Sequence, residues 1–129
     1  MAPRILSALA SVLSLSAAAC GGKDAGGGGS ALPAEAIAKA QEIYVQRCTP
    51  CHGDKGHGDG SASATLNPRP RNFSDPAWQK SVDDGHIMKI IKMGGMAVGK
   101  SAAMPANPDI KDPDIIAALK DRVRSFAAK

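Results

Sequence analysis

The sequence predicts a small all-α domain with three main helices and irregular loops. Segments 33–48, 81–94 and 112–126 carry apolar residues at three- and four-residue steps, which is the period of a helix with one buried face. No segment shows the two-residue alternation that is typical of a half-buried strand. Only four of the 129 residues are aromatic. Side chains alone would fill such an interior poorly, so we expect a bound group to complete it.

The helix over 33–48 is expected to bury one stripe of side chains. Ile37, Ala40, Tyr44 and Cys48 recur along it at three- and four-residue steps. This stripe would pack against the core and bring Cys48 to the edge of the interior.

Two further helices have recognisable ends. Segment 81–84 is a capping-box candidate with Asp in place of the usual Glu, and Gly94 stops the helix that follows. Asp112 and Pro113 indicate the start of the last helix. Segment 67–76, rich in Pro and Asn, predicts an irregular loop. The expected apolar faces carry Ile87, Ile90 and Ile91 in one helix and Ile116, Leu119, Val123 and Phe126 in the other.

The N-terminal residues indicate export and attachment to a membrane. Residues 1–19 combine a basic start with an apolar run that is short for a permanent membrane span, so we interpret them as a signal peptide. The residues before Cys20 resemble a bacterial lipobox, which implies that Cys20 is lipidated; the alternative is cleavage at an Ala-x-Ala site that leaves a free thiol. Residues 20–32 are expected to form a Gly-rich flexible tether. The domain 33–129 would then lie on the periplasmic side of a bacterial membrane.

Two cysteines and a histidine lie within five residues in the segment Cys48-Thr49-Pro50-Cys51-His52. Two thiols three residues apart can reach the two vinyl groups of one porphyrin edge, and the histidine that follows is placed to ligate its iron. A zinc site would need two more paired ligands, and a thioredoxin-like pair would need a βαβ surrounding. A structural disulfide would leave the histidine without a role. The motif therefore predicts one haem c, covalently attached through Cys48 and Cys51.

Three parts of the chain together resemble a small class I c-type cytochrome, of the bacterial monohaem kind. They are segment 40–53 around the cysteine motif, the glycine pair 94–95, and segment 99–105. The resemblance covers nearly all of the chain after the tether. It implies an electron-transfer protein rather than an enzyme, with His52 on one face of the haem and Met104 on the other.

The sixth iron ligand is expected to be a methionine. Met104 lies in a loop 52 residues after His52, and Pro105 restricts its backbone to an extended conformation suited to a residue that crosses a haem face. The resemblance implies the same residue. Met96, beside the glycine pair, is the second candidate.

Donors to the haem propionates are expected near the 67–76 loop. Arg69, Arg71 and the indole N–H of Trp78 are the candidates, because buried carboxylate oxygens need hydrogen-bond donors. Either arginine is alternatively a solvated surface charge. The resemblance implies a tryptophan against the ring at this point of the chain, which Trp78 matches.

Net charge and the expected iron ligands limit the classes of function that the protein can have. The formal net charge of +4 falls to about zero once removal of the leader, acylation, the C-terminal carboxylate and ionised propionates are counted, so no nucleic-acid partner is expected. We interpret the protein as a carrier of single electrons between transient redox partners. The alternatives are a haem c subunit of a larger oxidase or dehydrogenase, and a peroxidase-like or gas-binding haem protein with one open axial position. Lys89, Lys92 and Lys100 are expected near the haem edge that partners meet.

Overall fold

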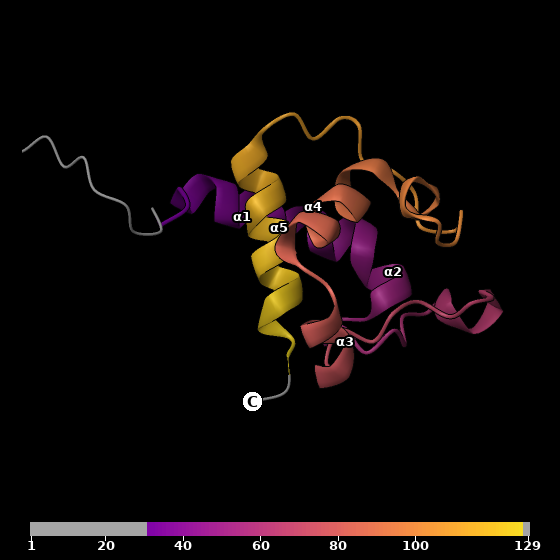
Figure 1. Cartoon of the computed structure of the whole chain (residues 1–129). Helices are drawn as coiled ribbons and strands as arrows, with labels where there is room; N and C mark the ends of the chain where they lie inside the picture. The colour runs from indigo at the N-terminus through magenta and orange to yellow at the C-terminus, as the bar shows by residue number, and fades with distance from the viewer. Residues whose placement is uncertain (1–30, 128–129) are drawn as a thin grey trace, which may run out of the picture.

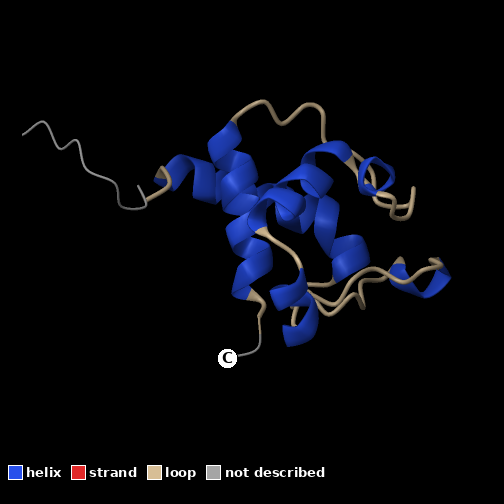
Figure 2. Cartoon of the chain, viewed as in Figure 1, coloured by secondary structure: helices blue, strands red, loops and turns tan. Residues whose placement is uncertain are grey.

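The computed structural model describes residues 31–127, which form helices and loops without a strand (Figures 1 and 2). The longer helices are α1 (Ala34–Ile43), α4 (Asp84–Met93) and α5 (Pro113–Ser125), and the shorter ones are α2 (Thr49–His52) and α3 (Pro76–Ser81). A π-helical turn η1 (Tyr44–Cys48) joins α1 to α2, and two 3₁₀ turns are η2 (Ser63–Thr65) and η3 (Gly95–Val98). The all-α prediction is confirmed. The signal peptide, Cys20 and most of the expected tether lie outside the described residues.

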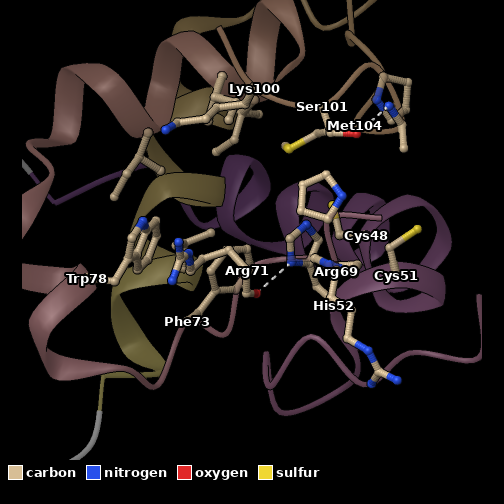
Figure 3. Close-up of a pocket in the computed structure, with 18 of the residues that line it drawn as sticks. Cys48, Cys51, His52, Arg69, Arg71, Phe73, Trp78, Lys100, Ser101 and Met104 are labelled. Atoms are coloured by element: carbon tan, nitrogen blue, oxygen red, sulfur yellow. Dashed lines mark hydrogen bonds between the residues drawn. The ribbon is translucent and has the colours of Figure 1, made fainter. Parts of the chain in front are cut away.

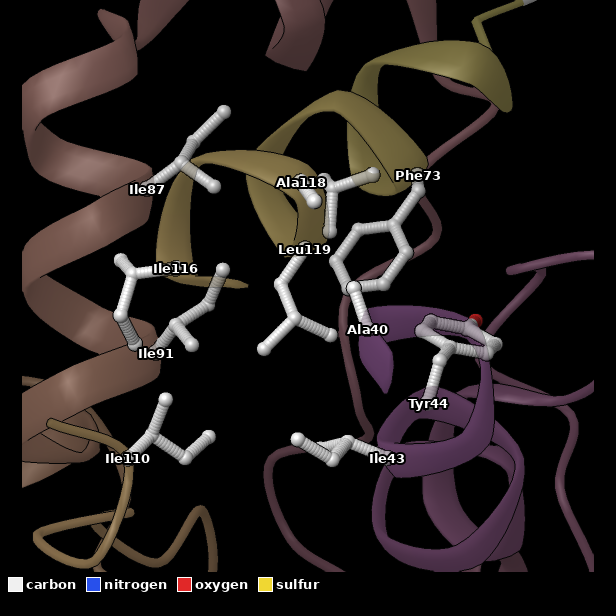
Figure 4. Packing of buried hydrophobic residues seen from close by; sticks show 11 residues of the cluster. Ala40, Ile43, Tyr44, Phe73, Ile87, Ile91, Ile110, Ile116, Ala118 and Leu119 are labelled. Atoms are coloured by element: carbon white, nitrogen blue, oxygen red, sulfur yellow. The ribbon is translucent and has the colours of Figure 1, made fainter. Parts of the chain in front are cut away.

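Helix α5 forms the centre of the core. It crosses α1 on one side and packs on α4 on the other, so that Leu119 lies between the isoleucines of α4 and the buried face of α1 (Figure 4). Leu119 is 2 % exposed. Complete burial of a leucine stabilises a fold by roughly 1.5–3 kcal/mol. This packing holds α1 and α4 at fixed positions, and the segments that line the site begin at their ends.

The buried stripe of α1 differs from the expected one. Ala40 and Tyr44 are buried as expected, but Ile37 is 52 % exposed and Ala36 takes its place in the core. The two small alanines let α5 approach closely, and Ile37 lies one residue, or 100° of helix, away from that contact. The assignment of Ile37 to the core is therefore wrong.

Aspartate side chains cap the N-termini of α4 and α5. Asp112 caps α5 by accepting a hydrogen bond from the backbone N–H of Asp114 at 2.9 Å, which confirms that start. The expected capping box at Ser81 is wrong, because Ser81 ends α3 and its hydroxyl donates to the Trp78 carbonyl at 2.8 Å. Asp83 caps α4 instead and accepts from the backbone N–H of His86 at 2.6 Å.

Helix α3 was not expected from the sequence. Asp75 accepts hydrogen bonds from the backbone N–H groups of Ala77 at 2.9 Å and Trp78 at 3.2 Å, and Pro76 occupies the first helical position. The same Asp-Pro signal marks the start of α5. The irregular loop therefore ends where α3 begins, and α3 turns Trp78 toward the interior.

Arg124 ties three helices together. Its guanidinium donates to the Gln79 carbonyl of α3 at 2.7 Å, to the Val82 carbonyl at 2.7 Å and to Asp84 of α4 at 2.8 Å. The side-chain amide of Gln79 in turn donates to the Phe73 carbonyl at 2.7 Å. These bonds hold the segment 73–84 against α5 and so fix one wall of the site.

Candidate functional site

One cavity of about 540 Å³ opens beside the cysteine motif. This volume lies in the range of sites that enclose a small molecule or cofactor. Its wall has three parts that differ in chemistry. The sulfur and nitrogen groups belong to Cys48, Cys51, His52 and Met104, the apolar part to Leu66, Phe73, Trp78, Val82, Ile87, Ile90 and Ile91, and the basic groups to Arg47, Arg69, Arg71 and Lys100.

The orientation of His52 is fixed by two neighbours. Its Nδ1 lies 3.1 Å from the carbonyl oxygen of Arg71, and because a carbonyl only accepts, Nδ1 carries the proton and Nε2 keeps its lone pair. The ring also stacks on Phe73, with centroids 4.3 Å apart and planes 16° apart. Burial lowers the pKa of His52, which favours the neutral imidazole. A neutral ring with a free Nε2 is the form that ligates a metal.

Helix α2 ends immediately after His52. Gly53 adopts φ 78°, a conformation that side chains rarely take, and its carbonyl accepts a hydrogen bond from the hydroxyl of buried Tyr44 at 3.0 Å. Burial raises the pKa of Tyr44 well above its ordinary value, so the phenol keeps its proton and remains a donor. This contact anchors the end of α2 to the core.

The glycine-rich loop after α2 wraps the cysteine motif. The backbone N–H of Gly58 donates to the His52 carbonyl at 2.8 Å, and that of Gly60 donates to the Cys51 carbonyl at 3.2 Å. These bonds satisfy carbonyls that a short helix leaves without intrahelical partners. A Cβ atom on Gly60 would collide with the carbonyl oxygens of Thr49 and Pro50. The close wrap therefore depends on a glycine at this position.

Both cysteines are free thiols in the wall of the cavity. Cys48 ends the π-helical turn and Cys51 lies in α2, and each is partly buried. Burial raises the pKa of the Cys48 thiol to about 11, so this thiol is protonated at neutral pH. The structure thus brings together the two thiols and the histidine that the sequence motif predicts to act at one site.

Met104 and His52 face each other across the cavity. Figure 3 shows the sulfur of Met104 and the ring of His52 directed into the space between them. The Met104 backbone is held by a bond from the N–H of Gly95 to the Met104 carbonyl at 3.0 Å. Met96, the second candidate, is 74 % exposed and is not among the residues that line the cavity.

The candidate propionate donors also lie around the cavity. Arg69, Arg71 and Trp78 all line it, although both arginines are exposed. The Arg71 guanidinium lies 6.0 Å from the centroid of the Trp78 ring and 3.8 Å from a carboxylate oxygen of Asp75. The cavity therefore has a basic rim on the side of α3.

Sequence reasoning missed several residues of the wall. Phe73 was not singled out, because a lone aromatic residue in a loop carries no periodic signal. His86 was not counted among the site residues either, yet it is half-buried and lines the cavity. Lys100, which was expected near the haem edge, lines the cavity as well. His86 lies in the first turn of α4, four residues before Ile90, and both therefore lie on the same side of the helix. The apolar Ile90 was the available indication that this side is buried.

The residues around the cavity fit a covalently attached haem. Two thiols adjoin a neutral imidazole, a thioether faces the imidazole, the remaining wall is largely apolar, and a basic rim suits two carboxylates. A helical domain folded around a cavity with this donor set defines a c-type cytochrome.

Comparisons with known proteins give the same class and a family. The family described as "Cytochrome C oxidase, cbb3-type, subunit III" matches residues 35–120, and the chain belongs to this family. Membership implies a covalently bound haem c, and the Cys48–His52 motif agrees with it.

The chain is also similar to two individual proteins. One is the "Cbb3-type cytochrome c oxidase subunit FixP" of Bradyrhizobium diazoefficiens, 31% identical over 89 residues, which cover 69% of this chain and 27% of that protein. The chain thus spans about a quarter of the length of this relative. The other is the solved structure of the "KustC0563 c-type cytochrome", with a TM-score of 0.50 and 26% identity over 69% of this chain and 98% of that chain.

Among residues 31–127, no helix combines the length and the apolar character needed to cross a membrane.

Proposed function

We propose that this cytochrome carries single electrons between redox proteins on the exported side of a bacterial membrane and catalyses no reaction of its own. The observation that carries this proposal is the position of His52 and Met104 on opposite sides of one cavity. An imidazole nitrogen and a thioether sulfur so placed would occupy both axial positions of the iron, which leaves no position for a substrate. Haem c supplies the one-electron Fe³⁺/Fe²⁺ couple.

The residues of the chain have separate tasks in this proposal. Cys48 and Cys51 hold the group, and the Arg71 carbonyl with Phe73 orients His52. The isoleucines of α4 keep water from one side of the cavity. Arg69, Arg71 and the indole N–H of Trp78 are the proposed donors to the propionates.

A place in a larger assembly is the second candidate. The family is that of a cbb3-type oxidase subunit, and the relative from Bradyrhizobium is itself described as such a subunit. In that setting the same residues would pass electrons to an oxidase rather than to a free partner. Lipidation at Cys20 is proposed as the means by which this chain stays at the membrane.

Methionine variants test the ligation on which the proposal rests. We expect the oxidised wild-type protein to show a sulfur-to-iron charge-transfer band near the red end of its spectrum, and the reduced protein not to bind carbon monoxide rapidly. Met104→Ala should abolish the band and admit carbon monoxide, whereas Met96→Ala should behave as wild type. Rapid carbon monoxide binding by the wild type would indicate the open-site alternative, and loss of the band in Met96→Ala alone would assign the ligand to Met96.

A further inference from the structure

The loop that carries Met104 is anchored on both sides of Met104, first to the turn η3 and then to the end of α4. Before Met104, the backbone N–H of Lys100 donates to the carbonyl of Gly95, the first residue of η3, at 2.8 Å. After it, the backbone N–H of Asn107 donates to the Lys92 carbonyl at 3.0 Å, and the Asn107 side-chain amide donates to the Ile91 carbonyl at 2.8 Å. Asn107 thus satisfies two C-terminal carbonyls of α4. Met104 lies between these two anchors.

A second set of contacts joins this loop to the segment that carries the cysteines. The Arg47 guanidinium donates to Asn107 Oδ1 at 3.2 Å and to both carboxylate oxygens of Asp109, at 2.9 Å and 2.7 Å. The planar fork of an arginine on a carboxylate fixes direction as well as distance. Within residues 31–127, no other side chain of segment 44–52 hydrogen-bonds to segment 94–110.

Arg47 and Asn107 each lie close in the chain to a group on one side of the cavity. Arg47 directly precedes Cys48, and Asn107 follows Met104 by three residues. Arg47 and Asn107 both line the cavity. The side chain of Asn107 is shared, because its amide nitrogen bonds to α4 and its oxygen bonds to Arg47. Loss of either bond would loosen the anchor on the C-terminal side of Met104.

We infer that Arg47, Asn107 and Asp109 form a latch, a set of positioning residues that holds the Met104 loop against the cysteine-bearing segment and sets how often Met104 leaves the cavity. The inference rests on the proposed function, because it takes Met104 as the axial ligand. The ion pair is accessible to solvent, with the side chains of Arg47 and Asp109 43% and 58% exposed. Dissolved salt screens such a pair, so opening of the loop should become more frequent as ionic strength rises.

Imidazole binding to the oxidised, haem-loaded protein measures this opening. At saturating imidazole, the rate of ligand replacement is limited by departure of Met104. We expect Asp109→Asn to raise this limiting rate about two- to fivefold, the range that an exposed ion pair supports. Asn107→Ala should raise it about tenfold, because the Ile91 carbonyl and the Arg47 guanidinium both lose their bond to the Asn107 side chain, while the backbone N–H at position 107 still donates to Lys92. Arg47→Gln, which removes the charge and the fork, should also raise the limiting rate. Arg47→Lys, which keeps the charge but loses the fork, should raise it less than Arg47→Gln does.

Matched controls separate the latch from general stability. Glu42→Gln breaks the exposed Lys39–Glu42 pair, which has an N–O distance of 2.8 Å and lies away from the loop, and should leave the rate unchanged. Added salt should accelerate replacement in the wild type but not in Asp109→Asn, a comparison that needs no strongly destabilised variant. The latch would be overturned if its variants had lower unfolding midpoints but the same replacement rates and the same salt response as the wild type. That result would leave the carrier proposal intact. A wild type without the charge-transfer band would instead overturn the carrier proposal, and the latch with it.

Discussion

The imidazole of His52 lies almost parallel to the phenyl ring of Phe73, with ring centroids 4.3 Å apart. Phe73 comes two residues after Arg71, whose carbonyl accepts the Nδ1 proton of His52. The same short loop therefore fixes both the tilt and the tautomer of the histidine. Its backbone is itself held, because the N–H of Phe73 donates to the Gly56 carbonyl at 2.7 Å.

Truncation of Phe73 should destabilise the haem-loaded protein. Phe73 is 7 % exposed, and we expect Phe73→Ala to lower the free energy of unfolding by about 3 kcal/mol, since a large buried ring is replaced by a cavity. Urea unfolding followed by circular dichroism measures this change. Ile37→Ala is the control, because Ile37 is 52 % exposed and should cost less than about 0.5 kcal/mol. Equal losses in the two variants would contradict the packing described for both residues.

A methyl group at Gly60 should disturb the cysteine motif. The added Cβ would meet the backbone oxygens of Thr49 and Pro50, which cannot move without shifting α2. We expect Gly60→Ala to reduce the yield of haem-loaded protein severalfold in a strain that exports and matures cytochromes. Gly85→Ala is the matched control, because its Cβ meets only a side-chain oxygen of Asp83 at 3.2 Å and an alanine favours a helix. A normal yield from Gly60→Ala would show that the loop does not wrap the motif as described.

The contribution of Asp84 to stability should depend on pH. Hydrogen bonds from Arg124 and Lys120 hold the pKa of Asp84 below its ordinary value of 3.8. The folded state therefore binds this proton more weakly than the unfolded state, so the stabilisation is complete above the ordinary pKa and is lost as pH falls through the lowered one.

Asp84→Asn tests this dependence. Because the carboxylate is exposed, we expect the variant to lose less than about 1 kcal/mol of unfolding free energy at neutral pH. Urea titrations at several pH values should show the difference from wild type shrink below pH 3.8. A difference that stays constant down to the most acidic pH would mean that ionisation of Asp84 is not the cause.

The three lysines expected at the haem edge should affect encounters with partners; among them, Lys100 lines the cavity and Lys89 and Lys92 do not. Lys89, Lys92 and Lys100 have exposed side chains on α4 and on the loop that carries Met104. Reversal of all three to Glu should slow electron transfer with the natural partner at low salt by roughly tenfold, with a smaller effect at high salt. Stopped-flow reduction measures the bimolecular rate. The charge-matched reversal of Lys39, Lys55 and Lys80 should have a smaller effect, and equal rates for the two triple variants would remove the lysines of α4 and the Met104 loop from the docking surface.

Local patterns in the sequence were sufficient for the helices and for the central motif. The Asp112-Pro113 pair marks the start of α5 because a side-chain cap and a fixed φ act within one turn. The cysteine motif predicts its chemistry for the same reason, since its ligands are neighbours in the chain. The equivalent Asp75-Pro76 pair was available but lay within a segment whose prolines indicated a loop.

Contacts between distant segments were beyond sequence reasoning. Whether Ile37 or Ala36 faces α5 depends on where the partner helix lies, because both belong to the same helix and differ by only 100°. The pairing of Arg47 with Asp109 joins residues 62 positions apart and leaves no periodic trace. Met96 is likewise exposed because of the way the turn η3 directs its side chain, which the residue types of that segment do not reveal.

The attachment of the haem is the claim on which the rest depends, and digestion of the exported protein with trypsin after extraction in acidified acetone tests it most directly. Cleavage after Arg47 and Lys55 releases the segment 48–55, which holds both cysteines and His52. We expect this peptide to keep its colour and to carry the mass of one haem. A colourless peptide with free or disulfide-bonded cysteines, and the pigment in the acetone, would contradict the account.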